Sequence, residues 1–341
     1  MQIFNGLLFP KSFYWKWNPS LRNHCHKISS FEKNQPTKST ALDTLKTILY
    51  FSLFNYPLKL EEICNFSITK DCETIRKNLD ELVAQNVIIK VDDYYMVDAN
   101  QSHIEKRKQG NLMAVAALVK AQQKALLISK FPFVEAVGVS GSLSKGYYDS
   151  KSDIDFFVIT RPGRLWICRT FLMLYKKIFL FNSRKYFCIN YFMSSGNLEV
   201  EEKNRFTATE IKTLIPFQGK TAFAAFYKKN EWVSDVFGQF DPNLSTTEEI
   251  RKLPIIRIIE RILETKSGNW LDSCFKSVTV TFWKMKFKEM AHDDFKIALK
   301  STKNISKHHP LNFQKKVISS LNEKYEEIKK NHNIELQKEY V

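Results

Sequence analysis

Residues 137–159 have the sequence VGVSGSLSKGYYDSKSDIDFFVI. An apolar run leads into Gly141 and Ser142, ten mostly small or polar residues follow, and a second apolar run begins at Asp153-Ile154-Asp155. We expect two strands joined through a tight turn. Because side chains alternate between the two faces of a strand, Asp153 and Asp155 should point to the same side.

This arrangement suits the chemistry of phosphate groups. Two carboxylates one pleat apart are ligands for a hard divalent cation such as Mg²⁺ or Mn²⁺. Gly141 lets the backbone approach a ligand closely, and the Ser142 hydroxyl and nearby amides can hold a phosphate. An Asp-x-Asp or a Gly-Ser pair alone is common by chance, so the ordered combination carries the prediction of metal-assisted phosphoryl or nucleotidyl transfer.

The motif resembles that of the nucleotidyltransferase superfamily, which includes DNA polymerase β, the CCA-adding enzymes and small bacterial antibiotic nucleotidyltransferases. Its shared pattern is a hydrophobic residue, Gly-Ser, a spacer, and an acidic-hydrophobic-acidic-hydrophobic run. The chain matches this pattern at Val139, Gly141, Ser142, Asp153, Ile154, Asp155 and Phe156. The resemblance implies a small sheet-and-helix core, which we place at residues 103–202.

The resemblance also implies a mechanism. Asp153 and Asp155 would be the catalytic metal ligands, and Gly141 and Ser142 would contact the β- and γ-phosphates of an NTP. Lys145 is a further candidate for a phosphate oxygen. The expected reaction is Mg²⁺- or Mn²⁺-dependent transfer of a nucleoside monophosphate to a hydroxyl or phosphate acceptor, with release of pyrophosphate. No motif specifies the acceptor or the base.

The superfamily takes a third carboxylate from a neighbouring strand, which we expect at residues 186–193. The polar candidate there is Asn190, which can ligate a metal through its carbonyl oxygen but brings no negative charge. Three alternatives stay open: catalysis with two carboxylates, a contribution from Glu199 or Glu201, or nucleotide binding without turnover. The last would make the chain a weak or inactive nucleotide-binding regulator.

Residues 40–100 predict a separate small module. Helical periodicity at 41–54, 58–64 and 71–85 is followed by two strand-like runs joined at Asp92-Asp93. This order resembles a winged helix-turn-helix. DNA-binding members expose basic or amide side chains on the third helix. Here Arg76 and Lys77 are balanced by acids, so we favour protein docking or substrate positioning over DNA binding.

The rest of the chain completes a mixed α+β prediction. Residues 1–39 form an irregular basic and aromatic arm, and a long helix is expected at 103–130. Residues 203–341 predict a helical C-terminal domain with helices at 207–215, 221–237, 255–264, 274–290 and 313–330. We interpret His308-His309, which precede Pro310, as a surface loop and not as a metal-ligand pair.

The charge of the chain indicates polyanionic partners. Its 52 Lys and Arg exceed its 36 Asp and Glu, which gives a formal net charge of +16. Besides the nucleotide, such a surface suits a nucleic acid or a protein partner, and it is compatible with a toxin or antitoxin component. The alternative is that the basic side chains only keep the surface solvated and bind no partner. Residues 161–190 contain seven basic residues and no acid. These residues either attract phosphate groups or form the solvent-exposed face of a helix.

The cysteine content and the hydropathy of the chain indicate the cellular compartment in which we expect the protein. The six cysteines include no Cys-x-x-Cys pair, which argues against a zinc framework and a dense disulfide scaffold. Without a visible secretory signal we expect a cytoplasmic protein with reduced thiols. The most apolar run, 165–181, is interrupted by Arg169, Lys176 and Lys177, so we expect a helix packed on the sheet and no membrane span.

Overall fold

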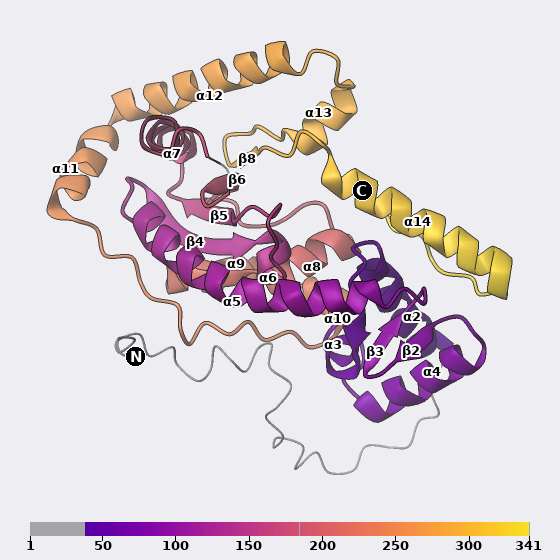
Figure 1. The fold of residues 1–341 in the computed structure, drawn as a ribbon. Coiled ribbons are helices and arrows are strands. Elements are labelled where there is room, and N and C mark those ends of the chain that lie inside the picture. Colours follow the sequence, from indigo (N-terminus) through magenta and orange to yellow (C-terminus); the bar gives the residue numbers. More distant parts are fainter. Residues whose placement is uncertain (1–37, 184, 341) are drawn as a thin grey trace, which may run out of the picture.

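The structure, a computed structural model, describes residues 38–183 and 185–340. The fold is mixed α+β, as expected from the sequence. A five-stranded sheet with helices on both faces forms the centre, and a smaller unit with its own three-stranded sheet lies beside it (Figure 1). The arm predicted at residues 1–39 lies, apart from its last two residues, outside the described residues.

The smaller unit contains the predicted three helices and hairpin. In chain order its elements are α2 (Lys38–Ser52), β1 (Leu58–Lys59), α3 (Leu60–Asn65), α4 (Cys72–Ala84), β2 (Ile89–Val91) and β3 (Tyr94–Met96). Strand β3 pairs antiparallel with both β1 and β2. Helix α4 begins after Asp71, whose carboxylate accepts a hydrogen bond from the Glu73 N–H. The interpretation of this unit as a winged helix remains a prediction.

Two cysteines of this unit form a disulfide. Cys64 lies in the last turn of α3 and Cys72 begins α4, and the chain between the helices folds back so that their Cα atoms lie 5.7 Å apart. The expectation of reduced thiols is therefore wrong for this pair, whose approach depends on a turn that the sequence analysis did not predict. Cys168, Cys188 and Cys274 are free.

The central sheet has the strand order β7-β4-β5-β6-β8. Its strands are β4 (Val134–Ser140), β5 (Asp155–Thr160), β6 (Cys188–Ser194), β7 (Ile215–Gln218) and β8 (Ile305–Lys307). Strands β4 and β5 are antiparallel, whereas β5 and β6 are parallel. The sequence did not predict the two edge strands, because both are short and β7 contains Pro216, a residue that sheets tolerate at an edge.

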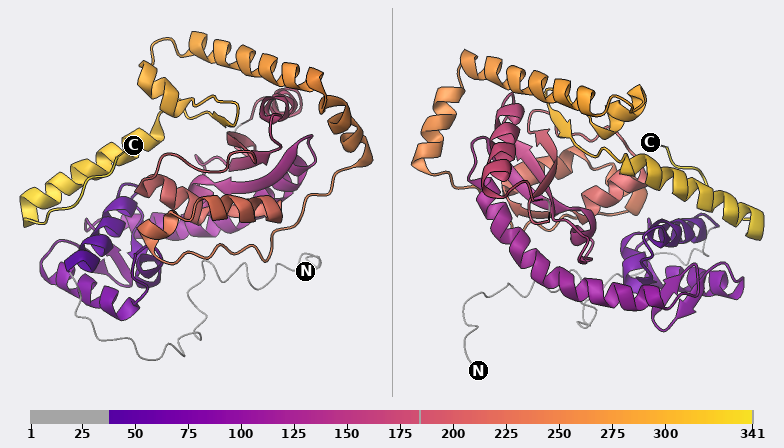
Figure 2. Two further views of the ribbon diagram at one scale, coloured as in Figure 1. Left: turned by 180° about the vertical axis from the view of Figure 1, so that it is seen from behind. Right: turned by 45° about the horizontal axis from the view of Figure 1, so that its top comes forward.

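Side-chain alternation along β5 separates the two faces of the sheet. Phe156 and Val158 pack in one apolar cluster with α5 (Ser102–Ser129) and α7 (Leu165–Phe179). Phe157 and Ile159 belong to the cluster on the other face, with α9 (Lys220–Lys229), which Figure 2 shows from behind. The same alternation places Asp155 on the face of Phe157.

Residues 203–341 contribute helices as well as β7 and β8. The remaining helices are α8 (Arg205–Thr213), α10 (Val233–Phe237), α11 (Pro254–Leu263), α12 (Lys266–Lys286), α13 (His292–Ala298) and α14 (Phe313–His332). The helix expected at 221–237 is interrupted at Asn230, whose amide donates to the Leu198 carbonyl and accepts from the Val200 N–H. The central sheet thus contains strands from the predicted core at residues 103–202 and from the predicted helical domain at residues 203–341.

A buried ion pair joins the smaller unit to the core. Arg205, at the start of α8, lies 3.0 Å from the Asp43 carboxylate of α2. Its guanidinium also pairs with Glu339, near the C-terminus. Since a buried charge without a partner costs several kcal/mol, these contacts fix α8 relative to α2.

Helix α5 is the one helix of the described chain that is long and apolar enough to span a membrane. A core helix meets the same criterion. Ala114, Ala121 and Ala125 of α5 are buried in the apolar cluster that includes β4. These contacts show how α5 uses part of its apolar surface within the protein.

Candidate functional site

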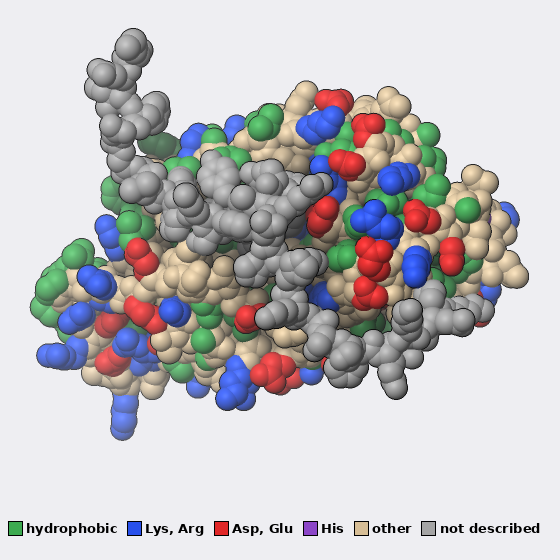
Figure 3. All heavy atoms as spheres, turned by 90° about the horizontal axis from the view of Figure 1, so that it is seen from below, with side chains coloured by type: hydrophobic (Ala, Val, Ile, Leu, Met, Phe, Trp, Pro, Cys, Tyr) green, Lys and Arg blue, Asp and Glu red, His purple; other side chains and the backbone are tan. Residues whose placement is uncertain are grey.

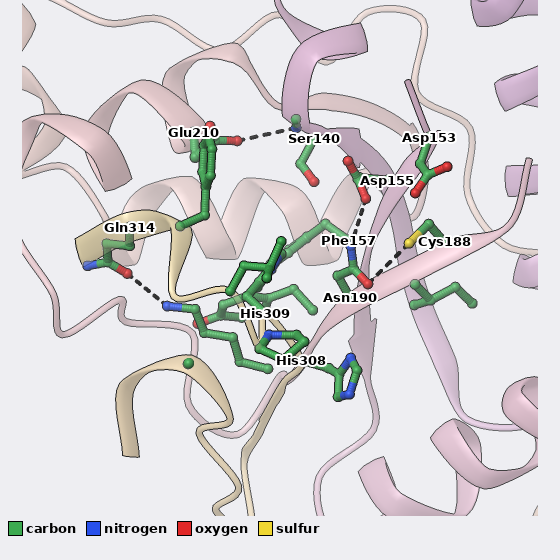
Figure 4. A pocket seen from close by; sticks show the side chains of 18 of the residues that line it. Ser140, Asp153, Asp155, Phe157, Cys188, Asn190, Glu210, His308, His309 and Gln314 are labelled. Atoms are coloured by element: carbon green, nitrogen blue, oxygen red, sulfur yellow. Dashed lines mark hydrogen bonds between the residues drawn. The ribbon is translucent and has the colours of Figure 1, made fainter. Parts of the chain in front are cut away.

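The two halves of the sequence motif meet at one cavity of about 650 Å³. Its wall includes five residues that the sequence predicts for the site, namely Gly141, Ser142, Asp153, Asp155 and Asn190. Figure 4 shows the two aspartates on one side of this cavity, with Glu210 and the His308–Gln314 segment around the rest. The tertiary structure therefore unites the carboxylates with the Gly-Ser turn, as the motif predicted.

The Gly-Ser turn requires glycine at its first position. Gly141 has a φ of +70°, a backbone conformation that side chains disfavour. A Cβ atom at Gly141 would lie 2.6 Å from Asp155 Oδ2. This contact follows from the register of the strands, in which Ser140 of β4 is opposite Asp155 of β5. The glycine thus allows the backbone to approach the carboxylate.

A bulge in β6 brings Asn190 to Asp155. The β5–β6 register passes from Ile189 directly to Tyr191, so Asn190 is the extra residue of the bulge. Its Nδ2 donates a hydrogen bond to Asp155 Oδ1 at 2.7 Å. The Cys188 thiol in turn donates to Asn190 Oδ1 at 3.2 Å. The nitrogen of the amide, and not its oxygen, therefore faces the carboxylate.

Burial raises the pKa of Asp155 to about 7. The charges of Asp153 and Glu210 act in the same direction, while the Cys188 thiol and the Lys145 ammonium oppose them. A carboxyl group with this pKa is only partly ionised near neutral pH. A divalent cation between the two aspartates would favour the ionised form instead.

The donor atoms present suit a hard cation only in part. The two carboxylates on the cavity wall are oxygen donors of the kind that Mg²⁺ and Mn²⁺ prefer, whereas the Asn190 oxygen accepts a hydrogen bond from the Cys188 thiol. Within the described ranges, however, no group of three or more His, Cys, Asp and Glu side chains is close enough to hold a metal ion. The two aspartates could hold such an ion only with ligands from water or substrate.

Glu199 and Glu201 do not take the place of a third carboxylate. Glu199 pairs with Lys203 and Glu201 with Lys300, and both carboxylates are more than half exposed. Neither side chain lines the cavity that holds Asp155. This alternative from the sequence analysis is therefore not supported.

Glu210 is a residue of the site that no pattern in the sequence indicated. It lies on α8, and its Oε2 accepts a hydrogen bond from the Gly141 N–H at 3.3 Å. Its Oε1 lies 2.6 Å from Lys145 Nζ, so the predicted phosphate ligand Lys145 is held in an ion pair. Glu210 is 69 residues from Gly141, and no local pattern connects the two positions.

The basic run at residues 161–190 divides between two roles. Arg169 and Lys176 line the cavity, and the Arg169 guanidinium lies 4.8 Å from the centre of the Trp283 ring. Burial lowers the pKa of Arg169 to about 10, still above neutral. Arg161 instead forms ion pairs with Glu260 of α11 and with Glu264, which directly follows this helix. Part of the run thus faces the cavity and part is structural.

His308 and His309 lie in a loop, as expected, but this loop faces the cavity and not the outer surface alone. Both residues line the cavity, because β8 carries the following segment along its wall. The His308 ring packs on Trp283, with centroids 4.8 Å apart. Burial, together with the nearby Lys307 ammonium, lowers the pKa of His309 to about 4. His309 is therefore neutral at pH 7.

The Gly-Ser turn and the two aspartates thus lie together at one cavity beside a mixed sheet. Residues 121–264 match the family model of the nucleotidyltransferase domain. The match includes every motif position and extends through α11. Neither the curated proteins nor the solved structures gave a match to this chain.

Proposed function

We propose that the chain is a metal-dependent nucleotidyltransferase that transfers a nucleoside monophosphate from an NTP to a hydroxyl or phosphate acceptor. One observation carries the proposal: Asp153 and Asp155 line the same cavity as the Gly141-Ser142 turn. The match of residues 121–264 to the nucleotidyltransferase domain supports it.

Each part of the cavity has a role in this proposal. The Gly141 N–H and the Ser142 hydroxyl bind phosphate oxygens, and Arg169 and Lys176 offset their charge. Asp153 and Asp155 would hold the cation, which when bound would supply positive charge next to the reacting phosphate and the acceptor oxygen. The apolar wall suits the base or the apolar part of an acceptor, and it includes Phe157, Phe206, Ile211, Phe226 and Phe313.

A second function is favoured by two observations. Asn190 stands where the superfamily has an acid, and it donates a hydrogen bond to Asp155. The Glu210 carboxylate accepts a hydrogen bond from the Gly141 N–H, the group that would otherwise bind a phosphate. A nucleotide-binding regulator with little or no turnover would have the same cavity without needing a third carboxylate. The smaller unit at residues 40–100 would then bind a nucleic acid or a protein.

The first experiment measures the thermal stability of the full chain with Mg²⁺ or Mn²⁺ and each of the four NTPs. A ligand at one hundred times its Kd that binds only the folded state adds about 2.7 kcal/mol to the free energy of unfolding. We expect a metal-dependent increase with at least one NTP, and its loss in Asp153→Asn and in Asp155→Asn.

Glu199→Gln is the matched control, because it removes an acid outside the cavity wall. It should retain the increase. A metal-independent increase, or one that survives both aspartate substitutions, would refute the proposed site. Transfer of label from an α-phosphate-labelled NTP, with release of pyrophosphate, then separates the enzyme from the regulator, which binds without either.

A further inference from the structure

Helix α11 presents its apolar side to solvent. The helix has isoleucines at 255, 256, 258, 259 and 262. Of these, Ile255, Ile258 and Ile262 are 58%, 53% and 64% exposed. A surface helix normally buries its apolar side and exposes its polar one. In α11 a large part of the apolar side faces solvent instead, so its exposed isoleucines need an explanation.

Ion pairs on the opposite side hold α11 in this orientation. Glu260 is 5% exposed and accepts a hydrogen bond from the Phe133 N–H at 2.7 Å. Its carboxylate also pairs with Arg161 and with Lys252, which precedes the helix. Rotation of the isoleucines inward would leave these buried charges without partners, at a cost of several kcal/mol.

Helix α12 continues the outward apolar surface. Trp270, Val278, Phe282 and Met285 are each more than half exposed, and their spacing places them along one side of the helix. The other side packs on α7, where the Asp272 carboxylate accepts from the Trp166 and Ile167 N–H groups. Helices α11 and α12 form an outer edge of the molecule in Figures 1 and 2.

The charges around this surface have one sign. Residues 251–288 contain nine Lys and Arg against three Asp and Glu. The three acids are engaged within the protein: Glu260 and Asp272 are buried, and Glu264 pairs with Arg161. The surface of the two helices therefore combines apolar side chains with an excess of positive charge, including the exposed Arg257 and Arg261. By contrast, on the face that Figure 3 shows from below, Lys and Arg side chains alternate with Asp and Glu side chains.

We propose that α11 and α12 bind the surface of an anionic lipid membrane. An amphipathic helix with Trp, Phe and aliphatic residues among basic ones inserts its apolar side at the headgroup boundary. A second copy of the chain would bring two positive surfaces together. A nucleic acid would not use the isoleucines, which do not stack on bases as aromatic rings do. An anionic membrane accommodates both, because its headgroups attract the positive charge and its acyl chains receive the apolar side chains.

The test is co-sedimentation of the full chain with vesicles of phosphatidylcholine alone or mixed with phosphatidylglycerol. We expect binding to the mixed vesicles, little binding to the neutral ones, and weaker binding at high salt. Ile258→Glu should weaken binding by at least about tenfold, since it removes buried apolar area and adds a negative charge. Phe282→Ser on α12 should weaken it too, and this variant serves if Ile258→Glu fails to fold.

Leu112→Glu is the matched control, because Leu112 is 75% exposed on α5, away from both helices. It should bind as the wild type does. The proposal is overturned if neither vesicle binds, if Leu112→Glu weakens binding as much as Ile258→Glu, or if neutral vesicles bind equally well. A wild-type dimer that Ile258→Glu converts to a monomer would also overturn it in favour of a second copy.

Discussion

The carboxylate of Glu210 lies against the backbone N–H of Gly141, with 3.3 Å between the nitrogen and Oε2. The other carboxylate oxygen pairs with Lys145. A negatively charged side chain thus occupies the two donors that a phosphate would use. In the proposed function, nucleotide binding must displace Glu210 or bind beside it against a like charge.

Glu210→Gln should therefore bind nucleotide more tightly. The amide keeps the size of the side chain, removes its charge and releases Lys145 for the phosphates. We expect the Kd of the NTP to fall about three- to tenfold, as measured by isothermal titration calorimetry. Glu201→Gln, which removes an exposed acid paired with Lys300, is the control and should leave the Kd unchanged. A weaker affinity in Glu210→Gln would instead show that the carboxylate helps to hold the cation.

Gly141→Ala should disrupt the site, and Gly163→Ala should not. Both glycines have a φ near +70°, but a Cβ at Gly163 would meet nothing within 4 Å. Gly163→Ala should cost about 1 kcal/mol in the free energy of unfolding, from backbone strain alone. Gly141→Ala adds the overlap with Asp155 and should cost about 2–4 kcal/mol. Chemical denaturation measures both values. Equal losses in the two variants would show that the turn accommodates a methyl group.

Asn190→Asp should strengthen metal binding. The substitution supplies the third carboxylate that the superfamily has, and in the absence of metal it places a like charge beside Asp155. We expect a lower stability without metal and an affinity for Mn²⁺ about tenfold higher, measured by titration calorimetry. The control is Asn182→Asp, which adds the same charge at an exposed position of the cavity wall. An equal gain in both variants would reflect general electrostatic attraction and not ligation by residue 190.

The stability of the protein should decrease in acid through His309. Its pKa is about 4 in the folded protein, against 6.5 for an ordinary histidine. The unfolded chain therefore binds the proton first, and stability is lost as the pH falls from 6.5 to 4. The loss is at most about 3 kcal/mol. Stability curves of His309→Gln should lack this part of the pH dependence, while those of His292→Gln, an exposed position on α13, should keep it. Identical curves for the wild type and His309→Gln would refute the assignment.

The local elements of the core could be predicted because their signals are local. The strands around Gly141 and Asp155 and the long helix α5 follow from apolar runs, turn residues and periodicity within short windows. The strands β7 and β8 escaped prediction for the same reason. They have four and three residues, and only their pairing with β4 and β6 makes them strands.

The sequence by itself determined the chemistry of the motif. The spacing of Asp153 and Asp155 specifies two carboxylates on one side of a strand, and the glycine at the turn specifies a close approach of the backbone. Each of these features depends only on residues that are neighbours in the sequence. The tertiary structure alone decided which distant groups join them: Asn190 through a bulge, Glu210 from α8, and His309 from the segment after β8. It also decided that α11 exposes its isoleucines, because the buried charge of Glu260 is paired only where Arg161 and Lys252 lie. Contacts between residues far apart in the chain leave no periodicity or spacing in the sequence.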